Sequence, residues 1–86
     1  MPSKYTPLEH YLRDLPPTQK EVTISFEQIE RILNDKLPPS AYKHQAWWSF
    51  ERSPHQPEKQ ALTNAGWKVE TVNFSEKWTR FVRMSD

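Results

Sequence analysis

The sequence predicts a small α+β domain. Two segments, residues 6–15 and 25–33, carry apolar residues at helical spacing behind helix-capping signals. The C-terminal part instead holds two segments of alternating residues, 67–72 and 78–84, which follow the single glycine of the chain. Because 86 residues hold one core, we expect a single domain over residues 1–86, with residues 5–84 as its ordered part.

The first predicted helix begins near Thr6. Thr6 is suited to cap this helix, Pro7 suits its first turn, and Glu9 completes a capping box. Two prolines at residues 16–17 end the helix after an apolar stripe of Leu8, Tyr11, Leu12 and Leu15. Residues 22–24 then alternate between apolar and polar types, which predicts a strand of three or four residues.

The second predicted helix has the clearest signals in the chain. Ser25 and Gln28 form a capping box, and one face of the helix is apolar, with Phe26, Ile29, Ile32 and Leu33. The prolines at residues 38–39 open a third, shorter helix, which we expect to extend to Gln45. Periodicity is then lost over residues 47–57, so a loop or an irregular strand is expected there.

A fourth helix is predicted over residues 58–65. Gly66 follows it at a position that favours a left-handed backbone, and the helix would bury Ala61, Leu62 and Ala65. Residues 67–72 and 78–84 are then expected to form two antiparallel strands joined by residues 73–77. The chain is therefore predicted to end in a β-hairpin.

This order is the one expected of a winged helix-turn-helix: an N-terminal short strand, three to four short helices and a C-terminal β-hairpin. In such a domain the second helix of the turn motif enters the major groove of DNA, and the hairpin contacts its backbone. The sequence therefore predicts a duplex-DNA-binding module whose groove-reading helix is residues 39–45. Its nucleic-acid-binding residues would be Ser40, Lys43, His44, Gln45, Arg52, Lys77 and Arg80, with Ala41 and Tyr42 packed inward.

A plainer interpretation competes for the same residues. Lys43, His44 and Gln45 also fit a solvated helix end, where the helix dipole favours cations. Arg83 is a further candidate for a phosphate contact, but it lies three residues from Arg80 on a strand, so the two side chains point to opposite faces. A lone domain with few basic contacts binds DNA weakly, so the DNA hypothesis also implies a homodimer or a larger assembly.

The adjacent pair Trp47 and Trp48 supports a second hypothesis. Neighbouring side chains point in different directions, so one indole is expected in the core and the other at a surface. With Phe50, this pair would form an aromatic patch that docks on another protein, and the chain would be a non-catalytic accessory factor. The formal net charge of +1 favours this alternative, since tight non-specific DNA binding needs dense phosphate neutralisation.

No pattern in the sequence is typical of an enzyme or a metal site. Cysteine is absent, the three histidines stand far apart, and a single glycine cannot form a phosphate-binding loop. The serines fit caps and turns better than nucleophiles. We therefore expect no catalysis, no cofactor, no metal and no small-molecule substrate. No apolar segment is long enough for a signal peptide or a membrane span, so a cytoplasmic protein is expected.

Short motifs along most of the chain are similar to those of one known domain. They are Tyr5-Thr6-Pro7-Leu8, Tyr11-Leu12, Ser25-Phe26, Ile29-Glu30, Ile32-Leu33, Leu37-Pro38, Ser40-Ala41, Trp47-Trp48 and Ala65-Gly66-Trp67. In these motifs the chain resembles a small bacterial and phage domain of unknown function, most specifically over residues 37–48. That resemblance implies no known activity. The domain often carries an asparagine two residues after the double tryptophan, where this chain has Phe50, so a contact by that asparagine is not expected here.

Overall fold

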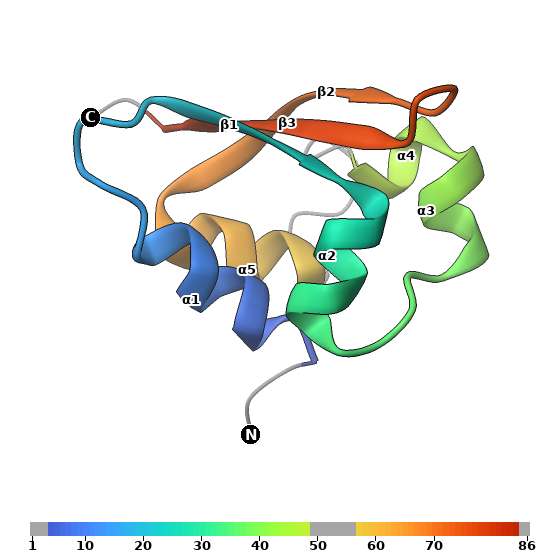
Figure 1. Ribbon diagram of the computed structural model, residues 1–86, viewed down its shortest axis with the longest axis horizontal. Coiled ribbons are helices and arrows are strands. Elements are labelled where there is room, and N and C mark those ends of the chain that lie inside the picture. Colours follow the sequence, from blue (N-terminus) through green and yellow to red (C-terminus); the bar gives the residue numbers. More distant parts are fainter. Residues whose placement is uncertain (1–3, 49–56, 85–86) are drawn as a thin grey trace.

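The helices of this domain lie against one face of a three-stranded antiparallel sheet (Figure 1). The structure is a computed structural model that describes residues 4–48 and 57–84. Its elements are α1 (Thr6–Arg13), β1 (Glu21–Ser25), α2 (Phe26–Leu33), α3 (Pro39–Lys43), α4 (Gln45–Trp48), α5 (Pro57–Ala65), β2 (Trp67–Asn73) and β3 (Trp78–Arg83). The predicted α+β class is confirmed. None of the helices in the described ranges is long and apolar enough to cross a membrane.

The sheet has the strand order β1-β3-β2, so the last strand of the domain lies in its centre. The predicted C-terminal hairpin is present as β2 and β3, with a bulge between Val69 and Thr71. The predicted N-terminal strand is five residues long and pairs along its whole length with β3, with Val22 opposite Phe81. The sheet therefore joins residues 21–25 to the C-terminal hairpin.

Helices α1 and α2 differ in how they begin. In α2 the Ser25 hydroxyl accepts a hydrogen bond from the backbone N–H of Gln28 at 3.0 Å, which confirms the predicted cap. In α1 the predicted capping box is wrong, because Thr6 is already helical and Glu9 forms an ion pair with Arg13 at 3.1 Å instead. The predicted stripe of α1 is confirmed: Leu8 and Leu12 are buried, and Tyr11 and Leu15 are half-buried.

The predicted third helix ends at Lys43, and a further short helix, α4, covers Gln45–Trp48, where a loop or irregular strand was predicted from residue 47. The backbone of His44 is extended, with φ −118° and ψ 119°, and separates α3 from α4. This break lets α4 fold back, so that the indole N–H of Trp48 donates to the carbonyl oxygen of Ala41 at 2.8 Å. Helix α5 starts one residue earlier than predicted, and Gly66 after it has the expected left-handed φ of 82°.

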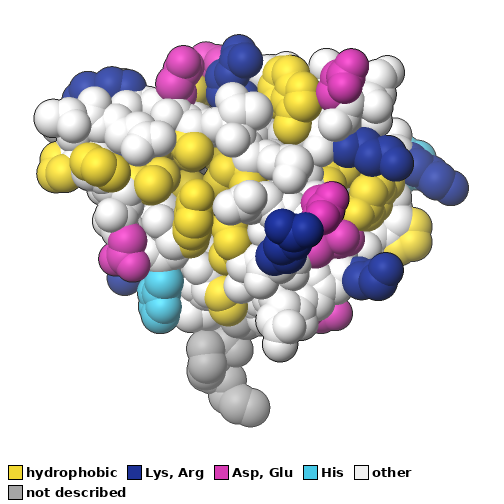
Figure 2. Space-filling view, in the orientation of Figure 1, with side chains coloured by type: hydrophobic (Ala, Val, Ile, Leu, Met, Phe, Trp, Pro, Cys, Tyr) yellow, Lys and Arg dark blue, Asp and Glu magenta, His cyan; other side chains and the backbone are white. Residues whose placement is uncertain are grey.

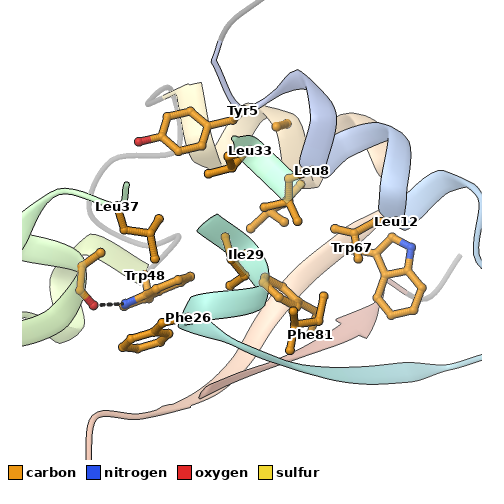
Figure 3. Close-up of a cluster of buried hydrophobic side chains, with 14 residues drawn as sticks. Tyr5, Leu8, Leu12, Phe26, Ile29, Leu33, Leu37, Trp48, Trp67 and Phe81 are labelled. Carbon is orange, nitrogen blue, oxygen red and sulfur yellow. Dashed lines mark hydrogen bonds between the residues drawn. The ribbon is translucent and has the colours of Figure 1, made fainter. Parts of the chain in front are cut away.

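Large aromatic and aliphatic side chains fill the space between helices and sheet (Figure 3). Phe26 is central: its ring stacks on Trp48 with the centroids 5.5 Å apart, and Tyr42 meets it edge-on at 5.1 Å. Trp67 and Phe81 are fully buried on the inner face of the sheet, as the sequence predicts for Trp67. The core also encloses Lys59, which is only 1% exposed and which the sequence does not single out.

Candidate functional site

The predicted DNA-reading residues on α3 and at its end are all exposed. Ser40, Lys43, His44 and Gln45 face solvent, whereas Ala41 between them is fully buried and Tyr42 is half-buried. The inward packing predicted for Ala41 and Tyr42 is confirmed. This segment, residues 40–45, therefore presents polar side chains to solvent on its outer side. Its inner side, formed by Ala41 and Tyr42, packs on the core.

Two hydrogen bonds fix the inside of this segment, and a third holds Leu37 just before α3. The Tyr42 hydroxyl donates to the Glu30 carboxylate at 2.6 Å, and the same carboxylate oxygen accepts the backbone N–H of Leu37 at 2.9 Å. The other bond to the segment is the one from the Trp48 indole to the Ala41 carbonyl. Helix α3 is therefore held both by α2 and by α4.

The Glu30–Tyr42 contact changes the ionisation of both groups. Burial alone would raise the pKa of Glu30, but the hydrogen bonds from Tyr42 and Leu37 and the charge of Lys36 lower that pKa below its usual value. Hydrogen bonding to Glu30, together with burial and the charge of Glu30, raises the pKa of Tyr42 to about 12. Near neutral pH the pair is therefore a carboxylate that accepts from a neutral phenol.

The turn of the β2–β3 hairpin lies close to the start of α2. Lys77 in this turn is exposed and has a left-handed φ of 60°, and its carbonyl oxygen accepts the backbone N–H of Phe26 at 2.9 Å. Between the turn and α3 lies an open groove of about 390 Å³, lined by Ser25, Phe26, Glu27, Glu30, Tyr42, Glu76 and Lys77. Lys43 and Lys77, two predicted DNA contacts, thus belong to elements on two sides of this groove.

The groove itself is acidic. Three of its lining residues are glutamates, and Lys77 is the one cation among them. Glu27 is paired with Arg31 one helical turn along α2, which offsets part of the negative charge. Figure 2 shows basic and acidic side chains interspersed over this face of the molecule. This acidic lining disfavours an anionic ligand in the groove.

The two arginines of β3 lie on opposite faces of the sheet, as predicted. Arg80 lies on the open face, where its guanidinium stands 5.2 Å from the centre of the Trp78 ring. Arg83 lies over the Trp67 ring at 4.6 Å and donates to the backbone carbonyls of Pro16 and Gln19. The Arg83 guanidinium is thus engaged within the domain, and its predicted phosphate contact stays a prediction.

The predicted aromatic patch is divided between the core and the surface. Trp48 is 4% exposed, so its indole is not presented to a partner protein. Trp47 is half-buried and packs edge-on against Trp48 at 4.7 Å and against Tyr5 at 6.2 Å. Phe50, the third member, lies outside the described residues, as does the predicted DNA contact Arg52.

One apolar cavity among the described residues measures about 10 Å³, which is at most the space of one water molecule. The cavity is lined by apolar side chains and by Lys59, whose ammonium donates to the carbonyl oxygen of Ala46 at 3.4 Å. Within residues 4–48 and 57–84, no three His, Asp or Glu side chains are placed to hold a metal ion.

Comparison with known proteins gives one family. The family model described as Domain of unknown function (DUF7662) matches residues 5–84. No curated protein and no solved structure gives a significant match.

Proposed function

Since the chain belongs to this family of domains of unknown function, we propose from its surface that it is a small nucleic-acid-binding module that contacts duplex DNA. The contacts would come from the exposed side chains of residues 40–45 and from the hairpin turn at Lys77. Arg52, which the sequence also predicts as a DNA contact, is kept in this proposal. This assignment makes the domain a binding module without catalytic activity.

The arrangement of elements supports a winged helix-turn-helix as the architecture of this module. Helix α1, strand β1 and helix α2 come first, further helices follow, and the β2–β3 hairpin comes last. Strand β1 joins the hairpin at its β3 side. In this proposal the hairpin is the wing, and the bond between Phe26 and Lys77 sets its position relative to the helices.

One observation carries the proposal: residues 40–45 form an exposed polar segment on a backbone that the core holds in place. The side chains of Ser40 and Gln45 can exchange hydrogen bonds with base edges, and Lys43 supplies a cation for a phosphate. Lys43 forms no ion pair within the described part of the chain. Because Tyr42 and Ala41 are fixed from inside, little conformational entropy is lost when the segment binds.

The charge of the domain limits how tightly it can bind. The net charge is +1, and the groove between α3 and the hairpin turn carries three glutamates. A single copy would make few phosphate contacts, and each contact contributes roughly one to the slope of log K against log salt. We therefore propose that the functional unit on DNA is a homodimer or part of a larger assembly.

The test is fluorescence anisotropy with a labelled duplex at low and at physiological salt. We expect saturable, salt-dependent binding that Lys43→Glu weakens. Lys20→Glu is the matched control, because Lys20 is also exposed and unpaired among the described residues but precedes β1, away from α3. Equal losses in the two variants would indicate general electrostatics, and no binding by wild type at low salt would exclude the module.

The accessory-protein alternative has less support. Of its three aromatic residues, Trp48 is buried and Trp47 is half-covered by Tyr5 and Trp48. If duplex binding is absent, Trp47→Ala becomes the variant for partner pull-downs. Trp48→Ala is unsuitable for that purpose because it removes a core side chain.

A further inference from the structure

Trp78 is the one tryptophan that the core does not use. Trp48 and Trp67 are buried in the core, and Trp47 packs against its edge. Trp78 is half-buried and takes no part in the core cluster. A large aromatic side chain that is held at the surface without a packing role often marks a contact site.

The register of the sheet places Trp78 on the open face. Thr79 and Phe81 on the same strand are fully buried, so the alternate residues Trp78 and Arg80 point away from the helices. Figure 1 shows the helices below the sheet and none above it. Three rows cross this face: Ser25, Trp78 and Asn73; Thr23, Arg80 and Thr71; and Glu21, Val82 and Lys68.

Arg80 is oriented next to the indole by its neighbours. Its guanidinium lies 5.2 Å from the Trp78 ring centre, and its Nε–H donates to the Thr23 hydroxyl at 3.3 Å. It also pairs with Glu70 at 3.7 Å, but both side chains are well exposed, at 38% and 47%. Such an exposed pair is weak, so a phosphate can replace Glu70 as the partner of Arg80.

We propose that this open face binds single-stranded nucleic acid. A base that is not paired in a duplex would stack on Trp78, and the phosphates of the strand would contact Arg80 and Lys68, which lies toward the other end of the face. Lys68 is exposed and lacks an ion pair within the described residues. Base–aromatic stacking on a sheet beside cations is an established way to bind single strands without sequence preference.

Other occupants fit this face less well. A duplex keeps its bases stacked inside, where an indole on a flat sheet cannot reach them. A partner protein would need a larger apolar centre than Trp78 and Val82 provide. A single strand needs one accessible ring and a few cations, and the three rows offer the half-buried Trp78 with Arg80 and Lys68, against one carboxylate, Glu21. This inference goes beyond the proposed duplex contact and does not depend on it, although Trp78 directly follows Lys77 in the chain.

The experiment measures anisotropy of labelled oligothymidylate, oligouridylate and a mixed-sequence duplex with the whole chain. Trp78→Leu removes the aromatic ring, and Trp78→Phe keeps one. We expect Trp78→Leu to weaken single-strand binding about tenfold and Trp78→Phe to preserve most of it. Lys43→Glu should leave single-strand binding unchanged, which separates this site from the duplex site. Thermal melting of both Trp78 variants checks that they fold.

Each outcome decides the proposal. The proposal is supported if wild type binds oligothymidylate, oligouridylate or both, and if this binding is lost only in Trp78→Leu. A preference for one of the two oligonucleotides identifies DNA or RNA as the ligand. The proposal is overturned if wild type binds neither strand at low salt, or if Trp78→Leu and Trp78→Phe bind as wild type does. It is also overturned if Trp78→Leu weakens duplex and single strand equally. If Trp78→Leu does not fold, Lys68→Glu replaces it, with the same loss expected and Lys20→Glu as the control.

Discussion

The two faces of strand β3 have opposite roles although their residues alternate along six positions. On the inner face, which is turned toward the helices, Thr79 and Phe81 are fully buried. On the outer face, Trp78 and Arg80 contact each other and remain accessible. An aromatic residue on this strand can therefore stabilise the fold or be available for binding, and a shift of one position in register decides which.

The largest effect is expected on the inner face, from Phe81→Ala. This substitution empties a fully buried site in a small core and should lower the free energy of unfolding by about 3–5 kcal/mol. For a domain of this size, such a loss approaches its whole stability. Urea unfolding followed by circular dichroism measures it. Val82→Ala on the outer face is the control, and comparable losses in both variants would refute the contrast between the faces.

A second, smaller effect is expected from Tyr42→Phe, which removes the hydroxyl bonded to Glu30. A hydrogen bond to a charged group contributes about 1.5–3 kcal/mol, and the partly exposed position of this pair favours the low end. This change tests whether the exposed segment at residues 40–45 is fixed independently of the sheet. We expect a lower free energy of unfolding in urea, with the native structure of the sheet unchanged, as seen by the chemical shifts of the β3 amides.

The same variant should alter the pH dependence of stability. The pKa of Tyr42 is raised to about 12 in the folded state from 10.0, so its contribution is complete below pH 10.0 and is lost as the pH rises toward 12. The pKa of Glu30 is lowered from 4.5, so its contribution is present above that value and is lost as the pH falls below it. Tyr42→Phe should remove the alkaline loss. If wild type and variant lose stability in parallel above pH 10.0, the hydrogen bond is not the cause.

A gain in stability is expected from Thr79→Val. The Thr79 hydroxyl is buried on the inner face and has no hydrogen-bond partner among the described residues. Valine has nearly the same shape without the polar group, so the substitution should stabilise the domain by about 1 kcal/mol. Thermal unfolding measures the change. A clear loss of stability would show that the hydroxyl has a partner after all.

The smallest effect on stability is expected from Trp78→Phe on the outer face. Because Trp78 takes no part in the core, the free energy of unfolding should change by less than about 0.5 kcal/mol. Denaturant unfolding of this variant, alongside Phe81→Ala, compares the two faces on one strand. A loss of several kcal/mol would mean that Trp78 is a structural residue, and the contrast between the faces would fail.

Local signals predicted those elements whose ends are set by neighbouring residues. Helix α2 begins at the serine cap expected of it, and Gly66 adopts the left-handed backbone expected after α5. The capping box at Thr6 failed because Glu9 is drawn to Arg13 instead. The break at His44 was not predicted, since the folding back of α4 that it permits is visible only in a contact between two helices, the bond from Trp48 to Ala41.

The sites depend on contacts between distant segments, which a single sequence does not reveal. The carboxylates of the groove come from α2 and from the hairpin turn. The burial of Lys59 on α5 contradicts what its residue type suggests. Trp78 could be assigned to neither side from the sequence, because the inner face of β3 is determined by its pairing with β1, more than fifty residues earlier.

The central position of β3 has a consequence for the synthesis of this protein. Both β1 and β2 pair only with β3 in this sheet, and β3 is the last of the three to leave the ribosome. Until it emerges, the two earlier strands and the apolar faces of α1 and α2 have no sheet to pack on. The sheet therefore cannot form before residues 78–83 are free, and the domain cannot complete its fold in stages from the N-terminus.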